Sequence, residues 1–144
     1  MKTNASMWAM FCDDVRQEVG NKLSFIGIYG PNLVVPALPT TLLKLCCVMV
    51  VRAPAEAPPK SVTLRILQDD EELHRMEIDV ATVQRAQAAT ADLATGDKSL
   101  QFHVIAQFAN LAISERCRIR ARALVDGEEL KGGSLVVMAA ALDS

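Results

Sequence analysis

The sequence has few of the residues from which enzyme active sites and metal sites are most often built. Its 144 residues include two histidines and four cysteines, and aromatic residues make up only 4% of the chain. No two cysteines have the CxxC spacing, and both histidines lie far from any cysteine-rich segment, so the pattern of a zinc site is missing. The GxSxG, Walker, Rossmann and HExxH patterns are missing as well. These absences favour a protein that is not an enzyme and that holds no metal or cofactor.

Long hydrophobic runs and a large excess of one charge are also missing. No stretch approaches the roughly 18 uncharged apolar residues of a membrane-spanning helix. The apolar run Ala5–Cys12 is at the short limit for a signal peptide, and no small-residue cleavage site follows it. The net charge is −2, with 15 basic and 17 acidic residues, so nothing global favours nucleic acid or an anionic membrane as a partner. We therefore expect a cytoplasmic protein that binds neither.

The cysteines fit free thiols better than a disulfide framework. They are Cys12, Cys46, Cys47 and Cys117. Cys46 and Cys47 are adjacent, so in a regular strand their side chains point to opposite faces and cannot both serve one core site. We expect four buried, reduced thiols and no disulfide.

Alternation of apolar and polar residues dominates the chain and predicts β-strands. Every second residue is apolar between Leu100 and Phe108, and again between Cys117 and Ala123, where arginines fill the alternate positions. Asp126-Gly127 tolerates positive φ and predicts a hairpin turn, and Gly132-Gly133 in the returning strand predicts a bulge or bend. With similar segments upstream, about eight short strands predict one all-β domain over residues 1–144, an antiparallel sandwich.

Proline-rich and alanine-rich segments interrupt this pattern. Residues 53–59 are expected to form a loop because proline removes a donor from the hydrogen-bond ladder, and Pro31, Pro36 and Pro39 bracket a short edge-like segment. The crossover 80–97 is rich in alanine, with apolar residues at helical spacing. We expect at most one short helix there, with an irregular crossover as the alternative.

The stretch "FCDDVRQEVGNKLSFIGIYG" combines a cysteine with several acidic residues and raises the question of a catalytic or metal-binding cluster. On a helix, Asp14 and Glu18 would converge and could hold a hard cation. The β-branched and aromatic flanks and the Gly20-Asn21 pair favour a hairpin with a two-residue turn, in which Asp14, Arg16 and Glu18 share a solvent-facing side. Asp13 then falls on the apolar side, so we expect either a bulge or a hydrogen-bonded, partly buried carboxylate there.

Four segments together carry a family resemblance: "CDDVRQEVGNKLSFIGIYG", "VVPALPTTLLKLCCVMVVRAP", "LRILQDDEE" and "RIRARALVDGEEL". They resemble an uncharacterised family of small bacterial and phage proteins, a domain of unknown function, over most of the chain apart from Ala81–Asp97. The resemblance implies an immunoglobulin-like or C2-like sandwich without known catalytic residues. It also implies a virion or virion-assembly component as one setting, with the virion as the location if the chain is phage-encoded.

The remaining candidates for chemistry have simpler structural explanations. His74 lies on the apolar parity of its strand and is expected in the core or at its rim, whereas His103 lies on the polar parity and is expected at the surface. The acidic turn Asp69–Glu72 could hold calcium only with carboxylates from other loops. The carboxylates considered for this are Asp13, Asp97 and Asp126.

A basic stripe is the most unusual charged feature. Arg116, Arg118, Arg120 and Arg122 recur at alternate positions of one expected strand, about 6–7 Å apart. Such a stripe could follow phosphates or an acidic partner. Pairing with acidic residues of neighbouring strands is the alternative, which the negative net charge and the lack of an exposed aromatic platform favour.

Three segments, "SMWAMFC", "FIGIYG" and "TLLKLCCVMVV", are apolar on both parities. One face of each sandwich sheet should meet water, so something must cover these strands, either the crossover or another subunit. Met7, Trp8 and Met10 are suitable interface residues. We therefore expect a non-enzymatic structural or interaction module that self-associates or joins a larger protein assembly. The alternative is a small-ligand or calcium-binding sandwich.

Overall fold

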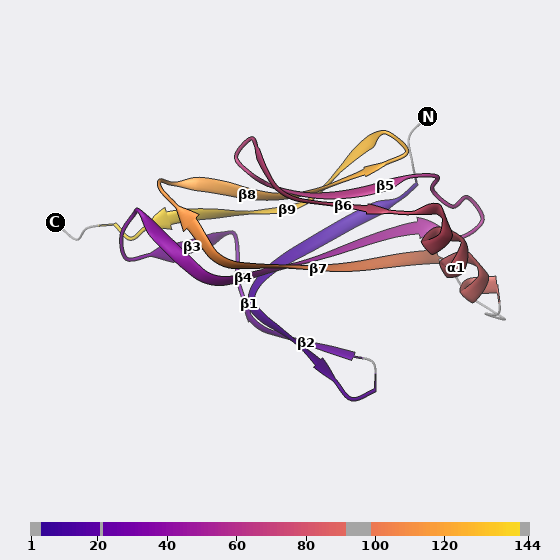
Figure 1. Ribbon diagram of the computed structural model, residues 1–144, viewed down its shortest axis with the longest axis horizontal. Coiled ribbons are helices and arrows are strands. Elements are labelled where there is room, and N and C mark those ends of the chain that lie inside the picture. The colour runs from indigo at the N-terminus through magenta and orange to yellow at the C-terminus, as the bar shows by residue number, and fades with distance from the viewer. Residues whose placement is uncertain (1–3, 21, 92–98, 142–144) are drawn as a thin grey trace.

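The polypeptide forms two β-sheets packed face to face, with a short helix at one end (Figure 1). The computed structural model describes residues 4–20, 22–91 and 99–141. Sheet A contains, in spatial order, β2 (Lys22–Ile28), β1 (Ser6–Glu18), β4 (Thr40–Pro54) and β7 (Ser99–Ile113). Sheet B contains β3 (Asn32–Val35), β9 (Glu128–Ala139), β8 (Cys117–Val125), β5 (Val62–Gln68) and β6 (Glu71–Ile78). Strand pairs are antiparallel except for β3 with β9, which is parallel. The expected all-β sandwich is confirmed.

The core between the sheets follows the alternation of the sequence. In β7, Leu100, Phe102 and Val104 point inward and are buried, whereas Gln101 and His103 are exposed. In β8 the apolar positions are buried and the arginines take the outer face. Fully burying one large apolar side chain contributes about 1.5–3 kcal/mol. The alternating apolar positions therefore supply the main stabilisation of the fold.

A turn and a bulge that the sequence predicts in sheet B are both confirmed. Asp126 and Gly127 have φ values of 50° and 85° and form a two-residue connection between the paired Val125 and Glu128. Gly133, with φ of 138°, lies at the shift in register between β8 and β9, which is the expected bulge. Positive φ at these positions suits glycine and, in turns, aspartate.

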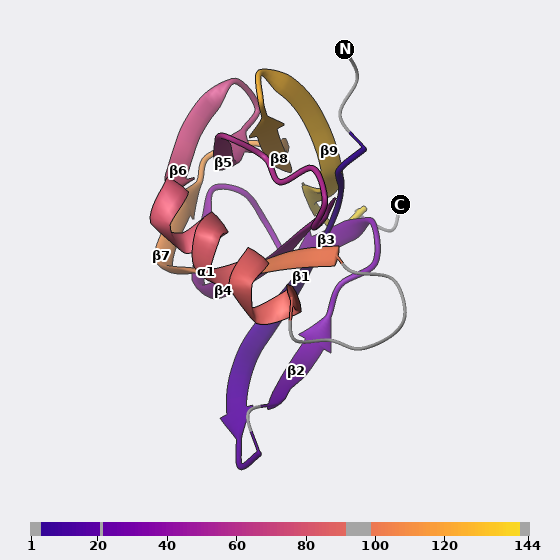
Figure 2. The ribbon, with the colours of Figure 1, turned by 90° about the vertical axis from the view of Figure 1, so that its right-hand side faces the viewer.

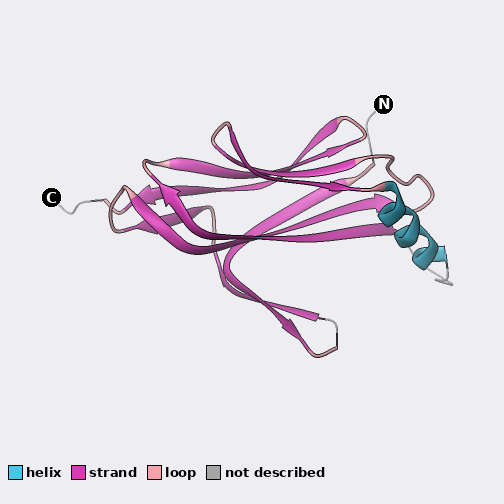
Figure 3. Ribbon diagram, viewed as in Figure 1, coloured by secondary structure: helices cyan, strands magenta, loops and turns pink. Residues whose placement is uncertain are grey.

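The expected short helix is α1 (Val80–Ala91), and residues 92–98 of the predicted crossover lie outside the described residues. Asp79 caps it: its carboxylate accepts a hydrogen bond from the backbone N–H of Thr82 at 2.7 Å. Val83 enters the main core. In Figures 2 and 3, α1 crosses one end of the sandwich beside β6 and β7.

The long strand β1 pairs with two different strands along its length. Residues 6–12 pair with β4, whereas residues 12–18 pair with β2, and this second half projects with β2 from the body of the sandwich (Figures 1 and 2). We call the projecting part, residues 13–28, the hairpin arm. The expected two-residue turn is wrong: Glu18 pairs with Lys22, so three residues connect the strands, and Asn21 among them lies outside the described residues. Val19, which a two-residue turn at Gly20-Asn21 would leave in the strand, lies in this turn and is 95% exposed.

The hairpin arm covers a second apolar cluster on the outer side of sheet A. Cys12, Cys46, Val48 and Val50 form this outer cluster and are buried. Val15 and Phe25 of the arm pack against it, together with Met10 and Ile105. Part of the apolar excess of β1 and β4 is thus covered by the chain's own hairpin. This cover is neither of the two that the sequence suggested.

Candidate functional site

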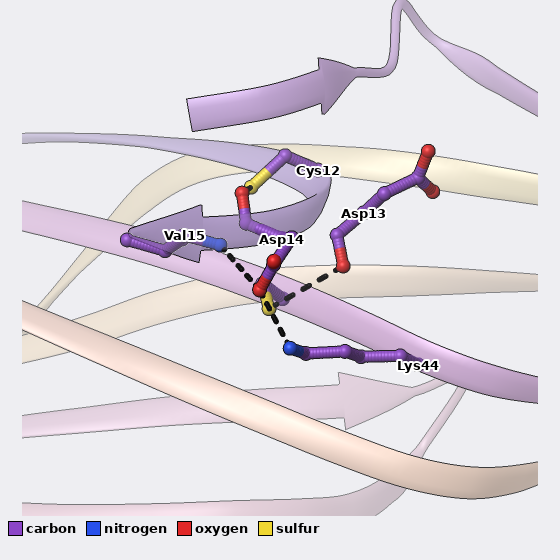
Figure 4. Close-up of polar contacts among 6 residues, drawn as sticks. Cys12, Asp13, Asp14, Val15 and Lys44 are labelled. Atoms are coloured by element: carbon purple, nitrogen blue, oxygen red, sulfur yellow. Dashed lines mark hydrogen bonds and ion pairs between the residues drawn. The ribbon is translucent and has the colours of Figure 1, made fainter. Parts of the chain in front are cut away.

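The acidic stretch lies where the hairpin arm leaves the sandwich (Figure 4). Asp14 accepts a hydrogen bond from Lys44 Nζ of β4 at 2.6 Å and another from the backbone N–H of Val15 at 2.9 Å. The hydrogen bond from Lys44 lowers the pKa of the Asp14 carboxyl, and the same bond raises the pKa of Lys44. The pair therefore ties the base of the arm to β4. Neither residue is held in the neutral state that a proton-transfer role would need.

Asp13 is satisfied by a different partner. Its carboxylate points away from Lys44 (Figure 4) and accepts a hydrogen bond from the hydroxyl of Tyr29. Burial and the Asp13 carboxylate raise the pKa of Tyr29 to about 12. The pairing of β1 with β2 keeps one register across this position, so the expected bulge is wrong. The expected hydrogen bond is present, but Asp13 is exposed and not partly buried.

The nearby thiols are poor nucleophiles. Cys12 of β1 and Cys46 of β4 are direct cross-strand partners, and their sulfurs donate weak hydrogen bonds to the carbonyls of Asp14 and Asp13. Burial raises the pKa of both thiols, and it raises the pKa of Cys47 to about 12. Because the thiolate is the reactive form, these cysteines act as apolar packing residues in the native state.

Among the described residues, the carboxylates considered for calcium are not brought together. Asp69 accepts a hydrogen bond from the backbone N–H of Arg118 at 3.0 Å. Asp126 accepts two from the backbone N–H groups of Lys60 and Ser61 at 2.8 and 3.0 Å. Asp97 lies outside the described residues. Within the described part of the chain, no three acidic, histidine or cysteine side chains are grouped so as to hold a metal ion.

A cavity of about 560 Å³ opens between the free edges of the two sheets, beside α1. Phe102 and Val104 of β7 provide apolar lining, and His103, Arg85 of α1 and Asp79 add polar groups. Its volume falls within the usual range of small-molecule sites. The sequence did not predict this cavity, since it depends on how the edge strands β6 and β7 are placed relative to the helix.

His74 of β6 is half-buried, as expected for a residue at the rim of the core.

The basic stripe lies on the outer face of sheet B. Arg116 precedes β8, whereas the other three arginines project from it. Arg120 pairs with Asp70 at 3.2 Å and Arg122 with Glu129 at 3.6 Å. Pairing with neighbouring acids thus accounts for two of the four arginines. The carbonyl of Asp69 also accepts a hydrogen bond from Arg120.

The three residues singled out for an interface do not share one face. Trp8 is 47% exposed, and its β4 partner Val50 belongs to the outer cluster. Met10 packs against the same cluster. Met7 has the opposite parity: it packs against the main core and lies close to Gly132. Only Trp8 of the three is exposed.

Comparison with known proteins gives a family but no activity. A search among curated proteins finds no match to this chain. Within the described ranges, no helix has the length and apolar character of a membrane span. The sequence profile of a family described as "Family of unknown function (DUF6941)" matches residues 7–138. Because the match extends over most of the 144 residues, the chain belongs to this family of unknown function.

Proposed function

We propose that this protein is a non-enzymatic interaction module that self-associates through the hairpin arm. The observation that carries the proposal is the edge of β2, which among the described strands pairs with β1 alone and projects from the sandwich (Figure 2). An exposed strand edge presents unpaired backbone N–H and C=O groups and is a template for another strand. The partner that we propose is a second copy of this chain, with two β2 strands pairing antiparallel across a twofold axis.

Exposed apolar side chains support this location. Ile26 and Ile28 of β2 are 43% and 56% exposed, and Val19 lies at the tip of the same arm. Edge strands that avoid association usually carry several charges or a proline. β2 has no proline, and its single charged residue is Lys22. Trp8, half-exposed on the outer side of sheet A, is a further candidate anchor.

Multi-angle light scattering at micromolar concentration tests the proposal. We expect a dimer or larger species that Ile26→Lys shifts toward monomer, since the new charge would be desolvated in the strand pair. Val34→Lys is the matched control, because Val34 is similarly exposed but lies on β3 of sheet B. A monomeric wild type, or an equal effect of the two variants, rejects association through β2. A pull-down from the native host then identifies any larger assembly, a virion included.

Trp8→Ala tests the anchor separately. We expect smaller species with an unchanged β-type circular dichroism spectrum, since a central interface aromatic can contribute about 2 kcal/mol or more to association. Loss of the spectrum together with the oligomer would instead assign Trp8 to the stability of the monomer.

The cavity beside α1 supports binding of a small amphiphilic ligand as a second candidate function. Its apolar lining and polar rim fit a molecule with both characters. Ala86→Leu should fill part of the cavity and weaken binding of an anilinonaphthalene sulfonate probe. Ala81→Leu on the same helix is the control, because Ala81 is exposed and is not among the lining residues. Equal probe binding by both variants would reject this candidate.

A further inference from the structure

The strand register places four cations side by side across sheet B. Arg122 of β8 lies opposite Arg65 of β5 on one side and opposite Lys131 of β9 on the other, and Arg65 lies opposite Arg75 of β6. Directly opposed residues of paired strands share a face, and adjacent strands are about 4.7–4.9 Å apart. Arg118 and Arg120 continue the charge along β8. We call this set the cationic face: Arg65, Arg75, Arg118, Arg120, Arg122 and Lys131.

Like charges directly opposite one another destabilise a sheet, so this row has a cost for the isolated protein. Burial and, next, the arginines Arg120 and Arg118 of the same strand also lower the pKa of the Arg122 guanidinium. The neighbouring carboxylates compensate only in part. The acidic residues that pair with the face are Glu72, Glu77, Glu129 and Asp70, at distances of 3.2–3.8 Å.

Donor capacity remains after these pairs are made. The Nε atoms of Arg65 and Arg120 have no hydrogen-bond acceptor among the described residues, but they are buried, so the capacity that a partner can reach lies in the exposed cations. The side chains of Arg118 and Lys131 are exposed, and no ion pair joins either of them to another described residue. Six cations thus meet four paired carboxylates in a chain whose net charge is −2.

The chemistry of the face selects among anionic partners. Five of the six cations are arginines, whose planar fork suits bidentate contact with carboxylates or phosphates. None of the face residues is an aromatic side chain on which bases could stack, and the chain as a whole carries a net charge of −2, which argues against nucleic acid as the partner. Arg118, Arg120 and Arg122 are spaced about 6–7 Å apart, which matches alternate side chains of an extended peptide.

We propose that the cationic face binds an acidic polypeptide segment in extended conformation, with carboxylates at alternate positions over β8. The surface lies on sheet B, away from the β2 edge, so this proposal is independent of self-association.

Fluorescence anisotropy with a labelled 12-residue peptide of alternating Glu and Thr tests the proposal. We expect salt-dependent binding that an otherwise identical Gln peptide does not show. The double variant Arg118→Ser/Lys131→Ser should weaken binding about fivefold, because it removes two exposed charge contacts. Lys22→Ser/Lys60→Ser is the matched control: the change in charge is the same, but the sites are in the hairpin arm and in the loop before β5. Circular dichroism confirms that all variants retain the fold.

Several results would overturn the proposal. They are no binding of the Glu peptide at low salt, equal binding of the Gln peptide, or equal weakening by the two double variants. Tighter binding of a 12-base-pair DNA duplex that is lost in Arg118→Ser/Lys131→Ser would assign the face to nucleic acid instead. Light scattering of the same variant separates this surface from the β2 edge, since its oligomeric state should match the wild type.

Discussion

At the scale of single residues, Gly27 and Asp13 depend on each other. Gly27 has φ of 68°, and a Cβ atom there would overlap the carboxylate of Asp13 on the paired strand. Gly27→Ala should therefore lose about 1–2 kcal/mol from the left-handed backbone alone and more from the collision. Chemical denaturation of the variant measures the total loss of stability.

The glycine at position 20 separates these two costs. Gly20 also has positive φ, 91°, but nothing lies within 4 Å of the position of its Cβ. Gly20→Ala should thus show the backbone cost without the collision, and Asp13→Ala/Gly27→Ala should recover most of the difference. Equal destabilisation by Gly20→Ala and Gly27→Ala would contradict the proposed collision.

The four thiols should be unreactive in the native protein. Burial raises the pKa of each, to about 12 for Cys47, so the thiolate fraction at pH 8 is small and access is blocked. Iodoacetamide at pH 8 should leave native protein unmodified and should modify all four cysteines in denaturant, as read by intact mass.

The raised pKa values of the thiols also favour the native state at low pH. This stabilisation is fully present below the unfolded thiol pKa, about 8.5, and is lost as the pH rises toward the folded values.

At the scale of elements, the start of α1 links stability to pH. Hydrogen bonds from Thr82 lower the pKa of the Asp79 carboxyl, so its contribution is present above the unfolded pKa, about 3.9, and is lost as the pH falls through the folded value. Asp79→Asn should keep the cap at neutral pH but lose this dependence. Asp79→Ala should lose both. Thermal denaturation from pH 3 to pH 7 compares the stability of the wild type, Asp79→Asn and Asp79→Ala. An unchanged pH dependence of stability in Asp79→Asn would contradict the role assigned to the Asp79 carboxylate.

Elements with a regular period could be predicted from the sequence, because one buried face imposes that period on a strand. This holds for β7 and β8 and for the Asp126-Gly127 turn, where the residue types dictate the conformation. The turn at residues 19–21 could not be placed, because Gly20 permits both a two-residue and a three-residue connection and only the pairing of Glu18 with Lys22 decides between them.

The partners across strands could not be predicted, because register joins residues that are distant in the sequence. The sequence showed the arginines of β8 but not their neighbours Arg65 and Lys131. Likewise, nothing adjacent to Asp14 indicated Lys44, and nothing adjacent to Asp13 indicated Tyr29. The one available signal was the alternation of apolar and polar residues around Arg65. It predicts the face of the sheet on which Arg65 lies, but not which residues of other strands lie beside it.

At the scale of the whole molecule, two apolar clusters share sheet A but differ in what covers them. The main core lies between two sheets and includes Cys47 and Cys117. The outer cluster, with Cys12 and Cys46, is covered by the hairpin arm. Segments with fewer packed neighbours open at lower free energy than the global core. The hairpin arm should therefore open without unfolding of the sandwich.

Phe25→Ala tests this difference, because Phe25 packs against the outer cluster and is not among the described residues that pack against the main core. Removing its ring should raise the labelling of Cys12 and Cys46 by iodoacetamide, while Cys47 and Cys117 stay protected by the main core. Peptide mass mapping reads the four sites separately. Phe108→Ala is the matched control, since Phe108 packs against the main core from β7. If Phe25→Ala exposed all four thiols at equal rates, the arm and the sandwich would form one cooperative unit. If it exposed none, the arm would not be what protects the outer cluster.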